Sequence, residues 1–67
     1  MSVAKVTELI ASSSTSFEDA INKGIQRATA TLEQVTGAWV EGQKVVIENG
    51  KIKEYRVILK VTFVLKS

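Results

Sequence analysis

The chain has no cysteine and no histidine among its 67 residues. Disulfide scaffolds and zinc sites built from cysteine and histidine are therefore excluded. The same two absences remove the side chains that most often serve as catalytic bases and nucleophiles. Residues 1–67 are long enough for one domain, which buries only about 60% of the surface that the unfolded chain exposes. Because neither disulfides nor zinc can stabilise so small a core, we expect the protein to gain stability by self-assembly.

Two kinds of segment are also missing: a basic-then-apolar leader after Met1, and an apolar run of about twenty residues. Their absence predicts a cytoplasmic protein without a membrane segment. The sequence has nine basic and seven acidic residues, which give a net charge of +2. The basic residues are scattered along the chain and form no run. This distribution is typical of a solvated surface, and it disfavours nucleic acid as the main partner.

Motifs for catalysis are absent as well. The serines at positions 12, 13, 14 and 16 precede a predicted helix but have no Gly-x-Ser-x-Gly frame, and no glycine-rich phosphate loop occurs. Glu41 and Glu48 lie on one predicted strand, on opposite faces and about 23 Å apart, too far to act as a carboxylate pair. The sequence therefore predicts a protein that is not an enzyme.

Hydrophobic spacing predicts four elements. Alternation at a period of two marks strands, and apolar residues repeating at three and four positions mark an amphipathic helix that Thr36 and Gly37 would end. Ser16, three residues before Asp19, supplies an N-cap with an acid in the first turn. Asn49-Gly50 is typical of a type I′ hairpin. The predicted elements are a strand over residues 3–11, a helix over 17–35, a strand over 38–48 and a strand over 51–66.

The order of these elements predicts an α+β domain with β-α-β-β topology. Placing the last strand between the other two makes every pairing antiparallel, in the order 1-3-2, with a right-handed crossover through the helix. One amphipathic helix would then pack on a three-stranded antiparallel sheet. The last strand is predicted to contact the helix through its apolar face, which consists of Tyr55, Val57, Leu59, Val61, Phe63 and Leu65. The helix residues predicted to meet this face are Ile21, Ile25, Ala28 and Leu32.

Gly24 lies on the apolar side of the predicted helix, where it costs about 1 kcal/mol relative to alanine. Either another backbone approaches closely there, or the glycine is simply tolerated. The opposite face of the sheet has no cover within the chain. Depending on register, Arg56 and Ile58 would be joined there by residues of the second strand: Trp39, Glu41, Gln43, Val45 and Ile47.

Tryptophan, arginine and aliphatic residues together on an exposed surface are typical of an interface or a ligand platform. The alternative is that Trp39 only helps to cover a subunit contact.

Several segments resemble the dodecins over nearly the whole chain: Val3–Ile10, Thr15–Ala20, Ile25–Ala28, the Asn49-Gly50 hairpin and, above all, Tyr55–Phe63.

This resemblance implies a protomer whose antiparallel sheet wraps around its helix, and a hollow shell of twelve protomers. Many dodecins bind flavins in pairs between protomers and store them without turnover. The resemblance therefore also implies FMN or riboflavin as a ligand of this protein. The ligand site would then be lined by Trp39, Gln43 and Arg56. Flavin-binding dodecins, however, have a stacking tryptophan where this chain has Gly37, and a glutamine where it has Arg56. Trp39 comes two positions later, on the same strand face and about 7 Å away.

The Tyr55-Arg56 pair and the segment from Gly37 to Val40 look closer to the branch called calcium dodecins, which do not depend on flavin. A flavin-independent structural or calcium-binding shell is therefore the alternative function. Calcium prefers oxygen ligands, but no EF-hand spacing identifies them, so the metal ligands stay unknown. The available carboxylates are Glu8, Glu41, Glu48 and Glu54.

Overall fold

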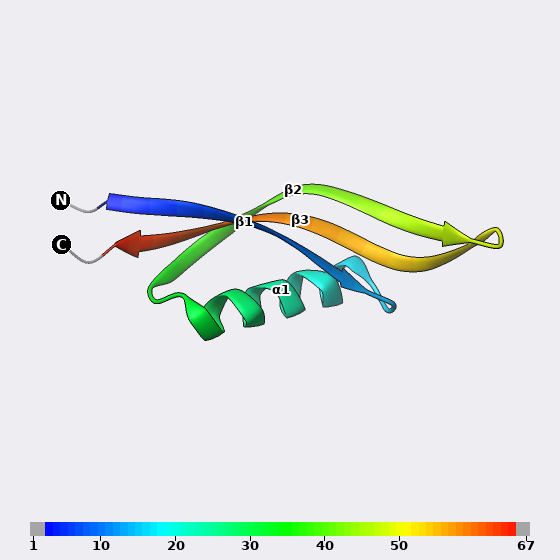
Figure 1. The fold of residues 1–67 in the computed structure, drawn as a ribbon, viewed down its shortest axis with the longest axis horizontal. Coiled ribbons are helices and arrows are strands. Elements are labelled where there is room, and N and C mark those ends of the chain that lie inside the picture. The colour runs from blue at the N-terminus through cyan, green and yellow to red at the C-terminus, as the bar shows by residue number, and fades with distance from the viewer. Residues whose placement is uncertain (1–2, 66–67) are drawn as a thin grey trace.

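A computed structural model of the chain describes residues 3–65. The elements in chain order are β1 (Val3–Ser13), α1 (Phe17–Thr31), β2 (Val35–Glu48) and β3 (Lys51–Leu65). The strands form one antiparallel sheet in the order β1-β3-β2, and α1 packs against one face of it (Figure 1). The predicted α+β class, topology and strand order are confirmed. Lys66, the last residue of the predicted third strand, lies outside the described residues.

The helix begins as predicted. Ser16 is the N-cap, and its Oγ accepts a hydrogen bond from the backbone N–H of Asp19 at 3.0 Å. The buried Ser13 at the end of β1 donates from its Oγ to Asp19 Oδ2 at 2.5 Å, and Lys23 Nζ lies 3.2 Å from the same oxygen. Asp19 therefore ties the end of the first strand to the first turn of the helix.

These contacts predict how stability depends on pH. The hydrogen bond from Ser13, and then the contact with Lys23, lower the pKa of Asp19 below its usual 3.8. A carboxylate whose pKa is lower in the folded state stabilises the fold above its unfolded pKa, and this contribution is lost as the pH falls through the folded value. We expect Asp19→Asn to be less stable than the parent at pH 7 and to lose less stability on acidification. Urea unfolding at pH 7 and pH 3 measures both, and Glu18→Gln, in the same helical turn, is the control. An equal acid loss in parent and Asp19→Asn would contradict the assignment.

The helix ends four residues before the predicted end. Leu32 is the C-cap, and its N–H donates to the carbonyl oxygen of Ala28 at 2.8 Å. Gln34 then turns the chain with a φ of 57°, and β2 begins at Val35. Leu32 and Val35 still pack against the core, so they continue the apolar spacing although neither is helical. Gly37, predicted to stop the helix, lies inside β2.

The core lies between α1 and the middle strand. Its fully buried large side chains are Val57, Leu59 and Val61 of β3, which alternate as predicted. The buried residues of the helix are small, namely Ala20, Gly24 and Ala28, so the helix axis lies close to the sheet. Partly buried apolar side chains surround this contact: Leu9, Ala11, Phe17, Ile21, Ile25, Leu32 and Val35.

Gly24 is where helix and sheet approach most tightly. A Cβ atom there would lie 2.6 Å from Leu59 Cδ1, 3.1 Å from Ala11 Cβ and 3.2 Å from Leu9 Cδ1. A close approach is therefore observed at Gly24, but the neighbours are side chains of the sheet, whereas the predicted neighbour was another backbone.

Gly24→Ala is expected to destabilise the fold. Overpacking costs about 1–3 kcal/mol, which exceeds the gain of about 1 kcal/mol in helix propensity because three neighbours restrict the new methyl group. Chemical unfolding measures the net loss. Gly37→Ala is the matched control, because no atom lies within 4 Å of the Cβ that it adds. A Gly24→Ala variant more stable than the parent would show that the sheet side chains move aside freely.

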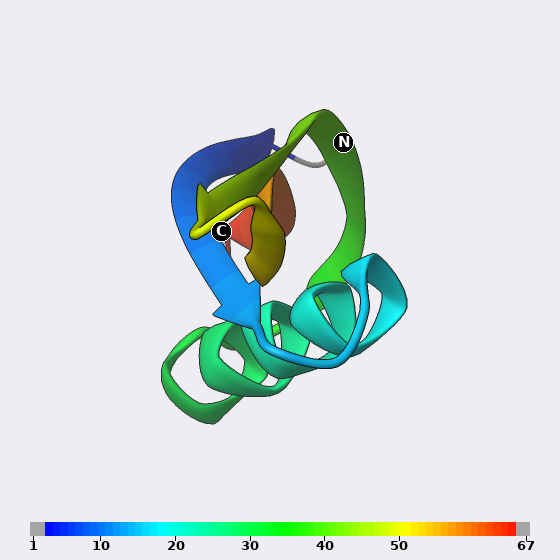
Figure 2. The same ribbon diagram turned by 90° about the vertical axis from the view of Figure 1, so that its right-hand side faces the viewer.

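The molecule is elongated, with extents of 51 × 19 × 13 Å. The hairpin of β2 and β3 continues well past the helix (Figure 1), and the view along the long axis shows α1 on one side of the strands (Figure 2). Asn49 and Gly50 have φ values of 54° and 72°, which confirms the predicted type I′ turn. Within residues 3–65, no helix combines the length and the apolar character needed to cross a membrane.

Candidate ligand-binding site

The face of the sheet that points away from α1, here called the outer face, has three cross-strand rows in its middle part. Each row has one residue from β1, β3 and β2 in turn, as fixed by the register. The first row is Ser12, Arg56 and Lys44. The second row is Ile10, Ile58 and Gly42. The third row is Glu8, Lys60 and Trp39.

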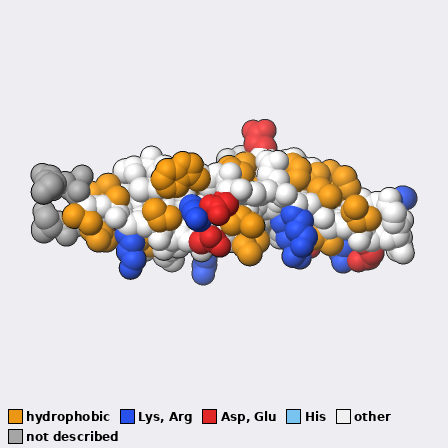
Figure 3. Space-filling model, turned by 90° about the horizontal axis from the view of Figure 1, so that it is seen from above, with side chains coloured by type: hydrophobic (Ala, Val, Ile, Leu, Met, Phe, Trp, Pro, Cys, Tyr) orange, Lys and Arg blue, Asp and Glu red, His pale blue; other side chains and the backbone are white. Residues whose placement is uncertain are grey.

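Apolar side chains on this face are unusually accessible. Ile10 is 66% exposed and Trp39 is 64% exposed, and Val6 next to the third row is 46% exposed. Figure 3 shows apolar side chains along the length of this face, with charged groups between them. A surface of this kind marks an interaction site in a small protein.

A β-bulge in β2 changes which side chains reach the outer face. The register shifts between Val40 and Gly42, so that Trp39 pairs with Lys60 whereas Gln43 pairs with Val57. One extra residue reverses the alternation of the strand beyond it. The prediction that Gln43 and Val45 share a face with Trp39 is therefore wrong: both are paired with residues of the helix-facing side. Ile47 pairs with Ile52 after a further irregularity.

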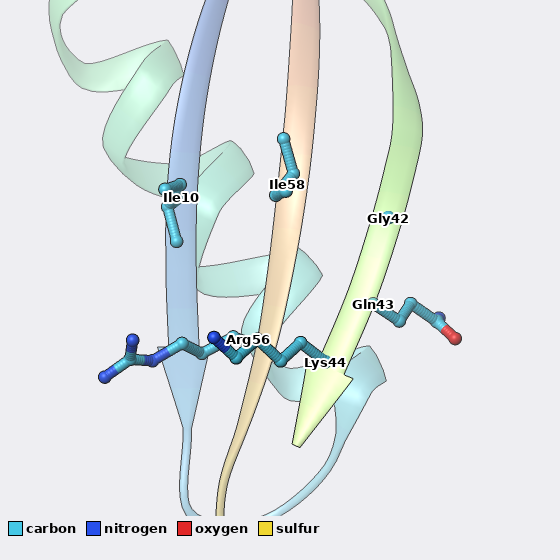
Figure 4. Close-up of a pocket in the computed structure, with 6 residues that line it drawn as sticks. All are labelled: Ile10, Gly42, Gln43, Lys44, Arg56 and Ile58. Carbon is cyan, nitrogen blue, oxygen red and sulfur yellow. The ribbon is translucent and has the colours of Figure 1, made fainter. Parts of the chain in front are cut away.

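A hollow of about 220 Å³ opens on the outer face (Figure 4). The second row forms its apolar floor, and Lys44 and Arg56 of the first row border it on one side. The side chain of Gln43 extends away from the other lining residues, past the edge of the sheet. We call this feature the outer-face hollow; its lining residues are Ile10, Gly42, Gln43, Lys44, Arg56 and Ile58.

The structure brings together two of the three predicted site residues. Arg56 and Gln43 line the outer-face hollow, Gln43 without directing its side chain into it, and Trp39 lies one row further along. Two residues of a strand span about 7 Å, so the indole is adjacent to the hollow but not part of its lining. Four other lining residues were not predicted as site residues: Ile10, Gly42, Lys44 and Ile58, of which only Ile58 was predicted on this face. The antiparallel order alone places some residue of β1 beside Ile58, but only the register identifies Ile10.

Ion pairs fix several charges around the hollow. Arg56 Nε donates to Glu54 Oε1 at 2.9 Å, and this bond is the main cause that lowers the pKa of Glu54. Lys60 Nζ lies 3.0 Å from Glu41 Oε2, which raises the pKa of Lys60. Such exposed pairs contribute little to stability, but they orient the side chains. For Lys44, no ion-pair partner is found anywhere between Val3 and Leu65.

The carboxylates do not form a metal site within one chain. In the part of the chain that the structure describes, no group of three or more acidic side chains could hold a metal ion. Glu41, Glu48 and Glu54 each pair with a cation, namely Lys60, Lys53 and Arg56. Three of the four carboxylates named as possible calcium ligands are thus already paired with cations of the same chain.

The fold, the chain length and the order of elements define a known class of small β-α-β-β proteins. The sequence matches the Dodecin family over residues 3–66, and the chain belongs to this family. Calcium dodecin of Mycobacterium tuberculosis is 33% identical over 66 residues, which are 98% of this chain and 93% of that protein.

Solved structures agree with this assignment. Dodecin from Streptomyces coelicolor superposes with a TM-score of 0.94 at 27% identity, covering 98% of this chain and 94% of that one. The crystal structure of calcium dodecin from M. tuberculosis, described as having a novel calcium-binding site, gives a TM-score of 0.84 at 35% identity. That alignment covers 96% of this chain and 91% of the other. The resemblance seen in the sequence is thus confirmed at the level of the family.

Proposed function

We propose that this protein is a non-enzymatic, cytoplasmic carrier that assembles as a hollow homododecamer and stores a flavin, FMN or riboflavin, between protomers. The observation that carries the proposal is the outer-face hollow, an apolar recess beside an exposed tryptophan on a surface that the chain itself does not cover. Flavin rings are planar and largely apolar, and they stack on aromatic side chains.

Surface area supports the assembly. One chain exposes 4919 Å², whereas a compact monomer of 7.3 kDa would expose about 4200 Å². The excess of about 700 Å² is close to the roughly 800 Å² that each partner buries in a stable protein interface. Among residues 3–65, only five apolar residues are buried, all of them at the contact between the helix and the middle strand. Covering the outer face with other copies would therefore add the apolar burial that a single copy lacks.

The position of Trp39 supports an aromatic ligand. Its indole is exposed in the row next to the hollow, and it shares the outer face with the apolar floor. A second protomer across this face would turn the open recess into a closed slot. A planar ring in that slot would contact Ile10 and Ile58 on one side and reach the indole at its edge. The site would thus be displaced by two residues from the tryptophan position of other flavin-binding dodecins.

A fluorescence titration tests this function. We expect riboflavin and FMN to lose fluorescence on binding, and Trp39→Ala to weaken binding of both by at least about tenfold because the stacking surface is lost. Trp39→Phe keeps a smaller ring and is the matched control, with an intermediate effect. Colourless purified protein and unquenched flavin at saturating protein concentration would contradict the proposal.

The second candidate is a calcium-binding shell without flavin. It is favoured by the 33% identity to a protein named calcium dodecin. The nearby charges oppose it, because Lys44, Arg56 and Lys60 lie on the same face as Glu8 and Glu54. Calorimetric titration of the chelator-treated protein with Ca²⁺ separates the two: the flavin carrier should give no saturable heat, and the calcium shell should.

A further inference from the structure

We infer that Glu8 of one copy forms an ion pair with Lys44 of a second copy across the outer face, and that the same two-fold contact contains the reciprocal pair. The inference rests on the assembly in the proposed function, because it needs a second copy over the outer face. It deepens that proposal by naming the two residues that orient the copies. It does not depend on a ligand in the outer-face hollow.

The first support is the distribution of unpaired charge. Charged residues in the three rows of the outer face are Glu8, Lys44, Arg56 and Lys60. Arg56 is neutralised by Glu54 at 2.9 Å. Lys60 is neutralised by Glu41 at 3.0 Å. Glu8 and Lys44 are both exposed, and neither has an ion-pair partner within the described residues 3–65. The rows therefore carry one acid and one base that the chain itself leaves unpaired.

The second support is the distance between these two residues in one chain. Glu8 belongs to β1 and the third row, whereas Lys44 belongs to β2 and the first row, so β3 lies between them. Two strand spacings are about 10 Å and two rows span about 13 Å, so the Cα atoms are about 16 Å apart. This distance is too long for a pair within the chain. In a single copy water solvates both charges, but a copy that covers the outer face removes this water, and each charge then needs a counter-ion.

The third support is symmetry. Contacts between identical chains are most often two-fold, so that the same surface faces itself. Glu8 and Lys44 occupy opposite corners of the three rows, with Ile58 midway between them. A two-fold axis over Ile58, at right angles to the line that joins the corners, places each of the two residues opposite the other in the second copy. One contact then contains two ion pairs, and the apolar second row lies between them.

The other simple two-fold arrangements of this face leave both charges without partners. When the axis is parallel to the strands or to the second row, each of the two charges faces Trp39 or Ser12 of the second copy. When the axis follows the line from Glu8 to Lys44, each charge faces its own equivalent. A buried charge without a counter-ion is costly, and like charges across an interface repel. Charge complementarity therefore selects one arrangement and makes a second copy of this chain the occupant of the outer face.

Charge reversal tests the pair. Glu8→Lys and Lys44→Glu should each weaken the contact, because both of its ion pairs become contacts between like charges. At low salt we expect the protein concentration at which the assembly dissociates to rise by at least about tenfold in either variant. Screening should reduce this rise at high salt. The double variant Glu8→Lys/Lys44→Glu restores both pairs with exchanged signs, so it should assemble like the parent. Light scattering over a dilution series measures the mass, and circular dichroism shows that each variant stays folded.

Mixing the two single variants separates a contact between copies from an effect within one chain. Glu8→Lys has two cations at these positions and Lys44→Glu has two anions, so an equimolar mixture should regain the parent's mass through mixed contacts. Glu8→Lys/Arg27→Glu is the matched control: it has the parent's net charge but reverses an exposed cation of α1 in place of Lys44. This control should dissociate as Glu8→Lys alone does.

The outcomes distinguish this inference from the proposed function. Unchanged assembly of both single variants would overturn the inference and leave the proposed assembly in place, as would a double variant and a mixture that both stay dissociated. A parent protein that is a single chain at every concentration would overturn the inference and the assembly together. Because the measured quantity is mass in the absence of ligand, a protein that binds no flavin would contradict storage and still give a full result here.

Discussion

Leu59→Ala is expected to remove about 3–5 kcal/mol from the free energy of unfolding. Leu59 is fully buried at the centre of the middle strand, and its partners in the flanking strands are Leu9 and Val40. A domain of this size is stable by about 3–10 kcal/mol, so the substitution removes a large fraction of the total. Urea unfolding followed by circular dichroism measures the loss. Leu65→Ala is the matched control: it deletes the same atoms from the same strand at a side chain that is 42% exposed, and we expect it to cost under about 1 kcal/mol.

Combining Leu59→Ala with Gly24→Ala tests the contact between the helix and the middle strand directly. The cavity left by Leu59→Ala lies where a Cβ on Gly24 would have met Leu59 Cδ1 at 2.6 Å. Gly24→Ala should therefore destabilise the parent but stabilise the Leu59→Ala variant, because the new methyl group enters the vacated space. The double-mutant cycle should give a coupling of about 1–2 kcal/mol. Additive effects of the two substitutions would show that helix and sheet do not meet at this point.

The sequence predicted the fold because its signals were local and redundant. Alternation in β3, the Ser16 cap and the Asn49-Gly50 turn each specify one element, and only one strand order makes every pairing antiparallel. The end of the helix was predicted wrongly because Leu32 and Val35 keep the helical spacing while packing from a cap and a strand. Spacing reports which residues face the core, and it does not report whether the backbone between them is still helical.

The site was harder to predict for a different reason. Lys44 and Gln43 exchange faces through one extra residue at Glu41, and the isolated glycine beside it, Gly42, is a local signal of a bulge that the alternation alone does not use. The contribution of Ile10 depends on a pairing between residues 48 positions apart, at the two ends of the chain. Arg56 lies on the face predicted for it because the alternation of its strand is unbroken. The face of the sheet was therefore predicted correctly for Arg56 and wrongly for Gln43, which lies beyond the bulge.

The largest effect expected on the assembled protein comes from Ile10→Glu. Ile10 is 66% exposed in one chain and lies in the apolar row of the outer face, so a neighbouring copy that covers this face would bury it. An unpaired carboxylate buried in an interface costs several kcal/mol, and it would recur at every equivalent contact of a symmetric shell. We expect the dodecamer proposed above to dissociate, with a mass in solution that falls from near twelve chains of 7.3 kDa towards that of one or a few chains.

Light scattering at micromolar concentration measures the mass, and circular dichroism shows whether the dissociated chain stays folded. Gln26→Glu is the matched control, because it adds the same charge at an exposed position of α1, on the opposite side of the molecule from the outer face. This control should keep the parent's mass. An Ile10→Glu protein that also kept that mass would place the subunit contacts elsewhere and leave the outer face open to solvent. Loss of mass by a chain that stays folded would instead support an interface between copies that covers the outer face.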